Sequence, residues 1–186
     1  MNVKLLNVPD LTFVDSAIGQ CYDKGCYTDP VKMHGRIDRV ANGKVTKHDS
    51  VLEFTDAIFE ITASTKVLLE MTRHRQASYA CKSSRYTIDK GVVIFEPSGD
   101  EDVDSALALW RETVEEMIAA GKPNDVVSLM LPQAYQYRWT CKFNYRSLQN
   151  FMALRLDKHA HFQIRAVAEA MLASLPEEHR YLFKDQ

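Results

Sequence analysis

The sequence has no long apolar segment, no excess of positive charge and no export signal, and each absence removes a class of protein. No apolar run approaches the roughly 18 residues that cross a bilayer. The N-terminal stretch lacks the basic, apolar and small-residue regions of a signal peptide. The formal net charge is −2, so no overall field attracts nucleic acid or anionic membranes. These absences predict a cytoplasmic protein with no nucleic-acid or membrane partner.

Paired cysteine motifs and metal-ligand arrays are also missing. The four cysteines show no CxxC spacing, and without an export signal we expect them to be reduced, buried and structural: Cys21, Cys26, Cys81 and Cys141. His159 and His161 are two residues apart and would point to different sides of a helix. Because there is also no HExxH or Cys–His array, no metal site is predicted.

Glycine is scarce, with seven residues, and neither GxxxxGKS nor GxGxxG occurs. This excludes a P-loop and a Rossmann phosphate turn. No repeat, low-complexity tract or Pro/Ser-rich linker divides the chain, and 46% of its residues are hydrophobic. We therefore expect a single domain spanning residues 1–186, with a proper core.

Alternation and helical spacing predict a set of strands and helices. The expected strands are 3–8, 53–64 and 133–143, and the expected helices are 14–22, 30–42, 64–75, 103–121, 123–131, 144–155 and 159–175. Ser64 is a candidate N-cap and Gly121 a candidate helix stop. In the helix 103–121 the predicted apolar stripe is Ala106, Leu109, Val114, Met117 and Ile118. Since no regular βαβ rhythm is present, the pattern predicts an α+β fold with a mixed or antiparallel sheet packed with helices.

The segment RHRQASYACKSSRY, residues 73–86, concentrates Arg, Lys and hydroxyl groups and contains no acid. Three explanations compete: a nucleic-acid contact, a site for a small phosphorylated molecule, or a solvated basic helix end followed by a turn. The Arg fork matches phosphate geometry, and Ser hydroxyls can complete an anion cradle. The spacing Ser83-Ser84-Arg85 suits a loop folded around one phosphate.

A second polar cluster lies in NYRSLQNFMALR. Asn144, Ser147, Leu148, Phe151, Leu154 and Arg155 recur at intervals of three or four, and Arg146 and Asn150 are likewise neighbours on a helix. Arg on a partly apolar stripe indicates an anion or a ligand edge. The alternative is a surface helix whose Arg pairs with Asp157 or another acid.

The third cluster, KHDSVLEF, holds the S-x-x-E pattern of a capping box in Ser50 and Glu53. His48 beside it is either a ligand donor or simply exposed.

Together the three clusters resemble the flavin-dependent thymidylate synthase family. That family carries Arg-His-Arg, seven residues and Ser-x-Arg-Tyr, matched here by Arg73-His74-Arg75 and Ser83-Ser84-Arg85-Tyr86. Its upstream His-Glu-Ser/Thr-x-x-Glu-His stretch is matched by 48–54, and its Leu-Pro, Asn-Ala-Arg-Ser-Leu and Leu-Arg by 131–132, 144–148 and 154–155. The order and spacing agree from about Cys21 to Ile164.

The resemblance implies a homotetramer of helices around a mixed sheet, with FAD between subunits and active sites shared by several chains. It implies the conversion of dUMP to dTMP, with methylenetetrahydrofolate as carbon donor and NADPH as reductant. No Cys nucleophile attacks the pyrimidine in this family, which suits cysteines that lack an activating motif.

The resemblance also implies roles for individual residues. The flavin set would be Ser50, Glu53, Arg73, His74, Arg75, Cys81, Asn144, Arg146 and Asn150. The nucleotide set would be Glu70, Arg73, Ser83, Ser84, Arg85 and Arg155. Arg155 would be the catalytic residue, favouring the electron-rich pyrimidine ring, and His48 would lie near folate and flavin.

Besides Ala80-Cys81, which stand where many members have Asn-Glu, three positions depart from the family pattern. Glu70 replaces a Gln, and an ionised carboxylate only accepts hydrogen bonds, which would favour an amino group such as that of dCMP. Ser128 replaces a phosphate-binding Arg, a loss of about 1.5–3 kcal/mol that Arg138 or Lys142 could offset. Phe54 replaces the second His. The alternatives are therefore a related enzyme acting on dCMP or giving a hydroxymethyl product, and a non-catalytic flavin- or nucleotide-binding homologue.

Overall fold

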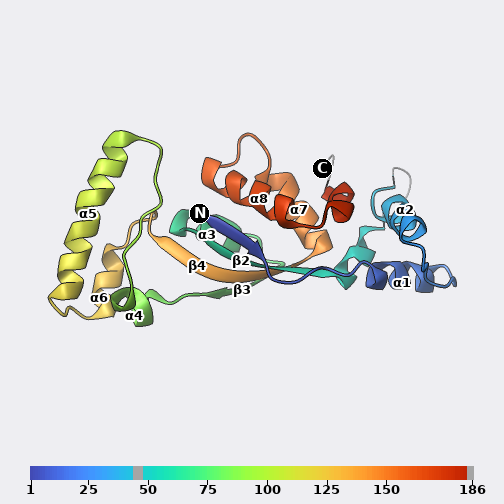
Figure 1. Ribbon diagram of the computed structural model, residues 1–186, viewed down its shortest axis with the longest axis horizontal. Coiled ribbons are helices and arrows are strands. Elements are labelled where there is room, and N and C mark those ends of the chain that lie inside the picture. Colours follow the sequence, from blue (N-terminus) through green and yellow to red (C-terminus); the bar gives the residue numbers. More distant parts are fainter. Residues whose placement is uncertain (44–47, 184–186) are drawn as a thin grey trace. The chain divides into compact units, whose positions relative to one another are not determined.

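A computed structural model describes residues 1–43 and 48–183, with the side chain of Asp89 excepted. Its secondary-structure elements are labelled in Figure 1. The chain divides into two compact units. Unit 1 comprises 1–2, 61–73 and 79–140, and unit 2 comprises 3–60, 74–78 and 141–186.

Four strands form one sheet in the order β1-β2-β4-β3, with the bounds β1 Asn2–Leu5, β2 Asp56–Ser64, β3 Ser78–Cys81 and β4 Gln136–Asn144. The α-helices are α1 Thr12–Cys21, α2 Pro30–Ala41, α3 Thr65–Thr72, α4 Ser84–Thr87, α5 Glu101–Ala119, α6 Asn124–Val127, α7 Tyr145–Arg155 and α8 Phe162–Ser174. Four short 3₁₀ helices complete the described fold: η1 Asp49–Phe54, η2 Ile88–Lys90, η3 Ser128–Met130 and η4 Glu177–Phe183.

Unit 1 contains α3 to α6 and has a small core of its own. Five residues are its buried members: Ile88, Val93, Val114, Val127 and Tyr135. Helix α5 begins where the Asp100 side chain accepts hydrogen bonds from the backbone N–H groups of the first turn. It ends before Gly121, whose φ of +68° favours glycine.

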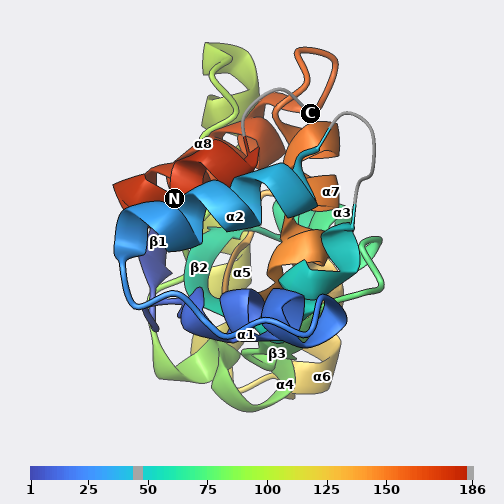
Figure 2. The ribbon, with the colours of Figure 1, turned by 90° about the vertical axis from the view of Figure 1, so that its right-hand side faces the viewer.

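Unit 2 contains α1, α2, α7, α8 and η4 and buries more large side chains. Its fully buried residues include Ile18, Ile37, Leu52, Phe143, Tyr145, Leu148, Phe151, Ile164, Val167 and Met171. Helices α1 and α2 contact each other, as do α7 and α8, and Figure 2 shows α1 and α2 facing the viewer.

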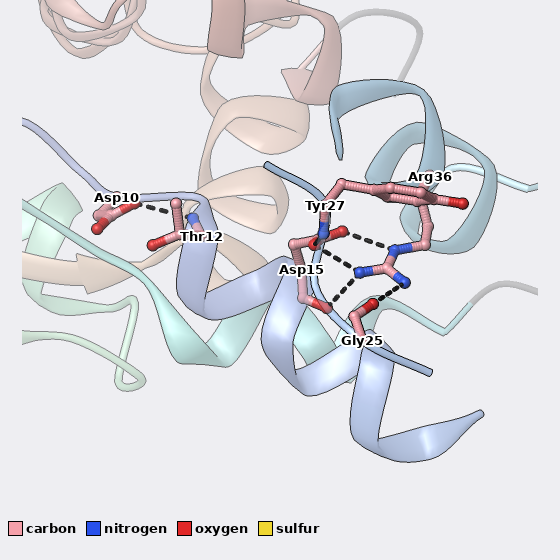
Figure 3. A network of polar contacts seen from close by, with 6 residues as sticks. All are labelled: Asp10, Thr12, Asp15, Gly25, Tyr27 and Arg36. Carbon is pink, nitrogen blue, oxygen red and sulfur yellow. Dashed lines mark hydrogen bonds and ion pairs between the residues drawn. The ribbon is translucent and has the colours of Figure 1, made fainter. Parts of the chain in front are cut away.

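A buried ion pair joins α1 to α2. The carboxylate of Asp15 is fully buried and accepts a hydrogen bond of 2.6 Å from Nε of Arg36. Arg36 also donates to the backbone carbonyl groups of Asp15 and Gly25, while Tyr27 N–H donates to Asp15 (Figure 3). The guanidinium lies 4.4 Å from the centre of the Tyr27 ring. This network fixes the connection between the two helices.

The α+β fold class predicted from the sequence is confirmed. The helix predicted from residue 64 does begin with Ser64 as N-cap, because Ser64 Oγ accepts a hydrogen bond from Val67 N. Strand β3 was missed, since four mostly exposed residues give no alternating pattern. The predicted apolar stripe of α5 was partly wrong: Val114 is buried, but Leu109 is 68% exposed.

The prediction that all four cysteines are buried was also wrong. Cys141 is buried in β4, whereas the other three are exposed: Cys21, Cys26 and Cys81. Within the described ranges there is no group of three or more His, Cys, Asp or Glu side chains placed to hold a metal ion. No helix of that part of the chain is both long enough and apolar enough to cross a membrane.

Candidate active site

Arg146, in the first turn of α7, is held by two acids of η1. Its Nη1 lies 2.6 Å from Oε1 of Glu53, and its Nε lies 3.2 Å from Oδ1 of Asp49. The hydrogen bond that Arg146 donates to Glu53 and the charge of Asp49 raise the pKa of the Arg146 guanidinium. Its side chain nevertheless remains 45% exposed. The arrangement therefore orients a permanent cation while keeping it accessible to an anionic ligand.

The capping box predicted for Ser50 and Glu53 is wrong. Helix η1 begins at Asp49, so Ser50 lies inside it, and no side chain caps its N-terminus. Glu53 contacts Arg146 instead, 93 residues further along the chain. Ser50 and His48, the two sequence neighbours of Asp49, are both exposed.

Helix α7 starts with Asn144, whose side-chain oxygen accepts a hydrogen bond of 2.8 Å from Ser147 N. Asn150 and Arg146 are both exposed and one turn apart, as the spacing predicted. The predicted common face of the helix was partly wrong. Ser147, Leu148 and Phe151 are buried, but Leu154 is 57% exposed.

His74 packs against α7 and is half-buried. Its ring centre lies 5.5 Å from that of Phe143 and 5.9 Å from that of Phe151. Its Nε2 lies 2.6 Å from Oγ of Ser147. Burial and the positive charge of Arg155 lower the pKa of His74 below its ordinary value of 6.5. His74 is therefore neutral at pH 7.

Arg155 is the last residue of α7 and is half-buried, close enough for its charge to act on His74. Arg75 is exposed. Unit 2 thus places His74, Arg146 and Arg155 on or against one helix, α7.

Glu70 in unit 1 contacts two cations of its own helix region. Its Oε1 lies 3.1 Å from Nζ of Lys66 and 3.8 Å from Nη1 of Arg73. The Glu70 side chain is only 13% exposed, whereas that of Arg73 is 73% exposed. An ion pair with Arg73 is therefore the alternative to a role of Glu70 in selecting the nucleotide base.

Ser83 immediately precedes the short helix α4 and Arg85 lies within it, which corrects the prediction of a phosphate loop. Ser84 to Thr87 form a helical turn, and Thr87 Oγ1 donates to the Ser83 carbonyl group at 2.7 Å. Arg85 Nε lies 3.0 Å from Asp125 Oδ1. The basic segment therefore has acidic partners, but they lie outside it, at Glu70 and Asp125.

Ser128 stands next to the same ion pair, because its hydroxyl donates to the Asp125 carbonyl group at 2.8 Å. Of the two candidate replacement cations, Lys142 in unit 2 lies 2.8 Å from Asp56. Arg138 is exposed and lines a pocket of about 350 Å³ in unit 1.

Cys81 ends β3, and partial burial raises the pKa of its thiol. A raised pKa keeps the sulfur protonated at pH 7, which makes it a poor nucleophile.

Three polar residues of these sites were missed as site residues in the sequence analysis. Asp49 and Asp125 orient Arg146 and Arg85, and Ser147 contacts His74. Ser147 and Asp49 lie within quoted motifs, whereas Asp125 does not. The two acids act over long sequence separations, so no local pattern could have revealed them.

Comparison with known proteins gives a consistent result. A family model described as "Thymidylate synthase complementing protein" matches residues 8–179. The flavin-dependent thymidylate synthase of Wolinella succinogenes is 34% identical over an alignment of 200 residues. The alignment covers 98% of this chain and 97% of that protein. The enzyme of the same name from Helicobacter pylori is 32% identical over 206 residues, covering 100% and 98%.

This chain belongs to the flavin-dependent thymidylate synthase family. The crystal structure of Thymidylate Synthase X from Helicobacter pylori with FAD and dUMP superposes with a TM-score of 0.89 at 29% identity. The match covers 100% of this chain and 98% of that one. The likeness therefore extends over the whole chain, including the three motifs that first indicated the family.

Proposed function

We propose that this member of the flavin-dependent thymidylate synthase family makes dTMP from dUMP, with methylenetetrahydrofolate as carbon donor, NADPH as reductant and FAD as bound cofactor. One observation carries the proposal. The chain matches enzymes of that name over its full length, and its helix α7 carries the cations and amides of the downstream family motifs. The Helicobacter pylori relative of the same fold holds FAD and dUMP.

The donor set of unit 2 fits a flavin dinucleotide. Arg75, Arg146, Ser50 and Asn150 are exposed donors, as the two phosphates and the ring edges of such a ligand require. Asp49 and Glu53 orient Arg146, so little conformational entropy would be lost when it binds phosphate. Asn144 and His74 would complete the flavin contacts. When bound, the flavin supplies the redox chemistry.

The nucleotide would be held by Glu70, Arg73, Ser83, Ser84 and Arg85, whereas Cys81 would belong to the flavin contacts. Arg155, on α7, would stabilise negative charge that develops on the pyrimidine, which a fixed cation does without transferring a proton. His48 would lie close to the folate and the flavin.

The contacts of Glu70 favour dUMP over dCMP. A carboxylate that accepts hydrogen bonds from Lys66 and lies near Arg73 has its charge balanced by the chain itself. It therefore imposes a smaller penalty on the uracil carbonyl groups than an unpaired acid would. For this reason the dCMP reading carries less support.

We also infer that the working form is a single-domain chain in a cytoplasmic homotetramer, with active sites completed by neighbouring subunits. The support is the resemblance in motifs, the full-length coverage of the relatives and the exposure of most predicted ligand donors.

A titration of the purified protein tests the function. The visible spectrum is recorded for bound flavin, and the flavin band is then followed during addition of dUMP and of dCMP, with methyl transfer measured separately by product analysis. The expected result is a flavin spectrum that dUMP perturbs at concentrations where dCMP does not, and dTMP as product.

Perturbation by dCMP alone would replace the proposed substrate. A protein that binds no flavin even after reconstitution with FAD would overturn the proposal and favour a binding protein.

A further inference from the structure

Ser147 joins two groups that both require its hydroxyl. The side chain is buried, with 3% exposure, in the first turn of α7. Its Oγ lies 2.5 Å from the backbone carbonyl oxygen of Gln76 and 2.6 Å from Nε2 of His74. Both short contacts lie inside unit 2, against the rings of Phe143 and Phe151.

Counting protons assigns the roles in this chain of contacts. A carbonyl oxygen can only accept, so the single hydroxyl proton of Ser147 is donated to Gln76. Ser147 Oγ must then act as the acceptor toward His74. The hydrogen bond to His74 therefore requires a proton on Nε2. In a neutral imidazole the other nitrogen, Nδ1, then carries a lone pair and can only accept.

We propose that Ser147 is a positioning residue that fixes His74 in the Nε2–H tautomer and thereby makes Nδ1 a hydrogen-bond acceptor. Phe143 and Phe151 fix the plane of the ring, and Ser147 determines which nitrogen is protonated. A second hydroxyl proton is not available, so the alternative tautomer would bring two lone pairs together at 2.6 Å.

The electrostatics of the site agree with this assignment. Burial and the charge of Arg155 lower the pKa of His74, which favours the neutral imidazole that the assignment requires, while a hydrogen bond with the backbone of Ser147 acts in the opposite direction. A neutral ring with an acceptor nitrogen suits an N–H donor such as the ring imide of a flavin. This last step rests on the proposed function, whereas the tautomer itself does not.

The tautomer can be measured directly by nitrogen NMR. The full-length protein, labelled with ¹⁵N in histidine, is recorded in a long-range ¹H–¹⁵N experiment above pH 7, before and after addition of FAD. The His74→Gln variant identifies the His74 signals. We expect Nε2 to resonate as a protonated nitrogen and Nδ1 as an unprotonated one, already in the protein without flavin.

Two variants at the same position and one elsewhere sharpen the test. Ser147→Ala removes the acceptor, so both His74 nitrogens should shift toward the average of two tautomers and the His74 pKa should fall further. Ser147→Thr keeps the hydroxyl and should preserve the wild-type pattern. Ser174→Ala is the matched control, because this half-buried serine of α8 donates to Met171 within its own helix; it should leave the His74 signals unchanged.

An unprotonated Nε2 in the wild-type protein would overturn the inference without any variant, and so would an unchanged tautomer in Ser147→Ala. Failure of FAD to bind leaves these outcomes intact and counts against the proposed function alone. Conversely, bound flavin together with an Nδ1–H tautomer would reject the role of Ser147 while sparing the enzyme assignment.

Discussion

The fully buried carboxylate of Asp15 binds the guanidinium of Arg36 from two sides, through Nε and Nη2, and so links α1 to α2 (Figure 3). Arg36 is itself only 8% exposed and donates further to the backbone carbonyl groups of Asp15 and Gly25. A buried pair of this kind contributes little net stability as a unit, because desolvation of both charges offsets their attraction. Removing one partner is different, because it leaves the other charge buried and alone.

Asp15→Asn should therefore destabilise the protein by about 3–5 kcal/mol. The substitution keeps the shape of the side chain, removes its charge and turns one acceptor oxygen into an NH₂ group, so the loss would reflect the unpaired guanidinium together with one lost acceptor. Thermal or urea unfolding at one fixed protein concentration measures it, since the proposed assembly would make the midpoint concentration-dependent. Glu115→Gln is a suitable control, because that exposed acid lies 4.0 Å from Arg111 at the surface. Equal midpoints for the Asp15 and Glu115 variants would contradict the prediction.

Arg146→Ala should weaken FAD binding by about 10- to 100-fold, the loss expected for one or two hydrogen bonds between a cation and phosphate. The fold should survive, because the side chain is 45% exposed and its two acids can be hydrated. Flavin fluorescence during titration of the flavin-free protein gives the dissociation constant. Arg39→Ala removes an equally permanent charge from an exposed site of α2 and should change affinity little. A similar loss in both variants would mean that only net charge is recognised.

How much of this molecule could be predicted from sequence depends on the distance over which each interaction acts. The helix caps and periodic elements are local, so Ser64, the long helices and strands β2 and β4 were predictable. The family motifs likewise indicated the family correctly, and one of them falls on α7, which forms where a helix was predicted. The interaction partners of individual side chains could not be predicted. Glu53 fits a local capping pattern, yet Arg146 competes for it from the other end of the chain.

The same limit applies to the basic segment. Its own residues contain no acid, and only the fold brings Asp125 to Arg85. Strand β3 could not be predicted for another reason. Its residues are mostly exposed, so its sequence does not alternate between apolar and polar residues. The short helix α4 replaced the expected loop because Ser83 and Thr87 close a turn through their own hydrogen bond.

Ser128→Arg should tighten dUMP binding about tenfold, which corresponds to about 1.4 kcal/mol. An Arg at this position lies three residues from Asp125 in a helical turn and can pair with that acid, leaving Arg85 to the nucleotide phosphate. Titration of the flavin band gives the affinity. Leu129→Arg is the matched control, because it adds the same charge one residue away at a site that is 85% exposed. If both variants tighten binding equally, long-range charge explains the effect; if neither does, Asp125 does not compete with the phosphate.

Stability should fall as the pH drops below about 6.5, because the buried His179 and the half-buried His74 must take up protons on unfolding. Burial lowers the pKa of His179, with His34 acting in the same direction and Glu178 and Asp10 opposing it. Burial also lowers the pKa of His74. The unfolded chain thus binds more protons than the folded one between the lowered pKa values and the ordinary value of about 6.5. The stability is complete above that window and is lost progressively as pH falls through it.

His179→Gln should reduce this pH slope, by up to about 1.4 kcal/mol per pH unit for one group, in unfolding curves recorded from pH 7.5 to 5 at fixed concentration. Tyr145→Phe is the contrasting variant, since its hydroxyl lies 2.9 Å from His179 Nδ1 but does not titrate in this range. It should cost about 0.5–1.5 kcal/mol at every pH and leave the slope largely intact. An unchanged slope in His179→Gln would show that the pH dependence of folding resides elsewhere in the chain.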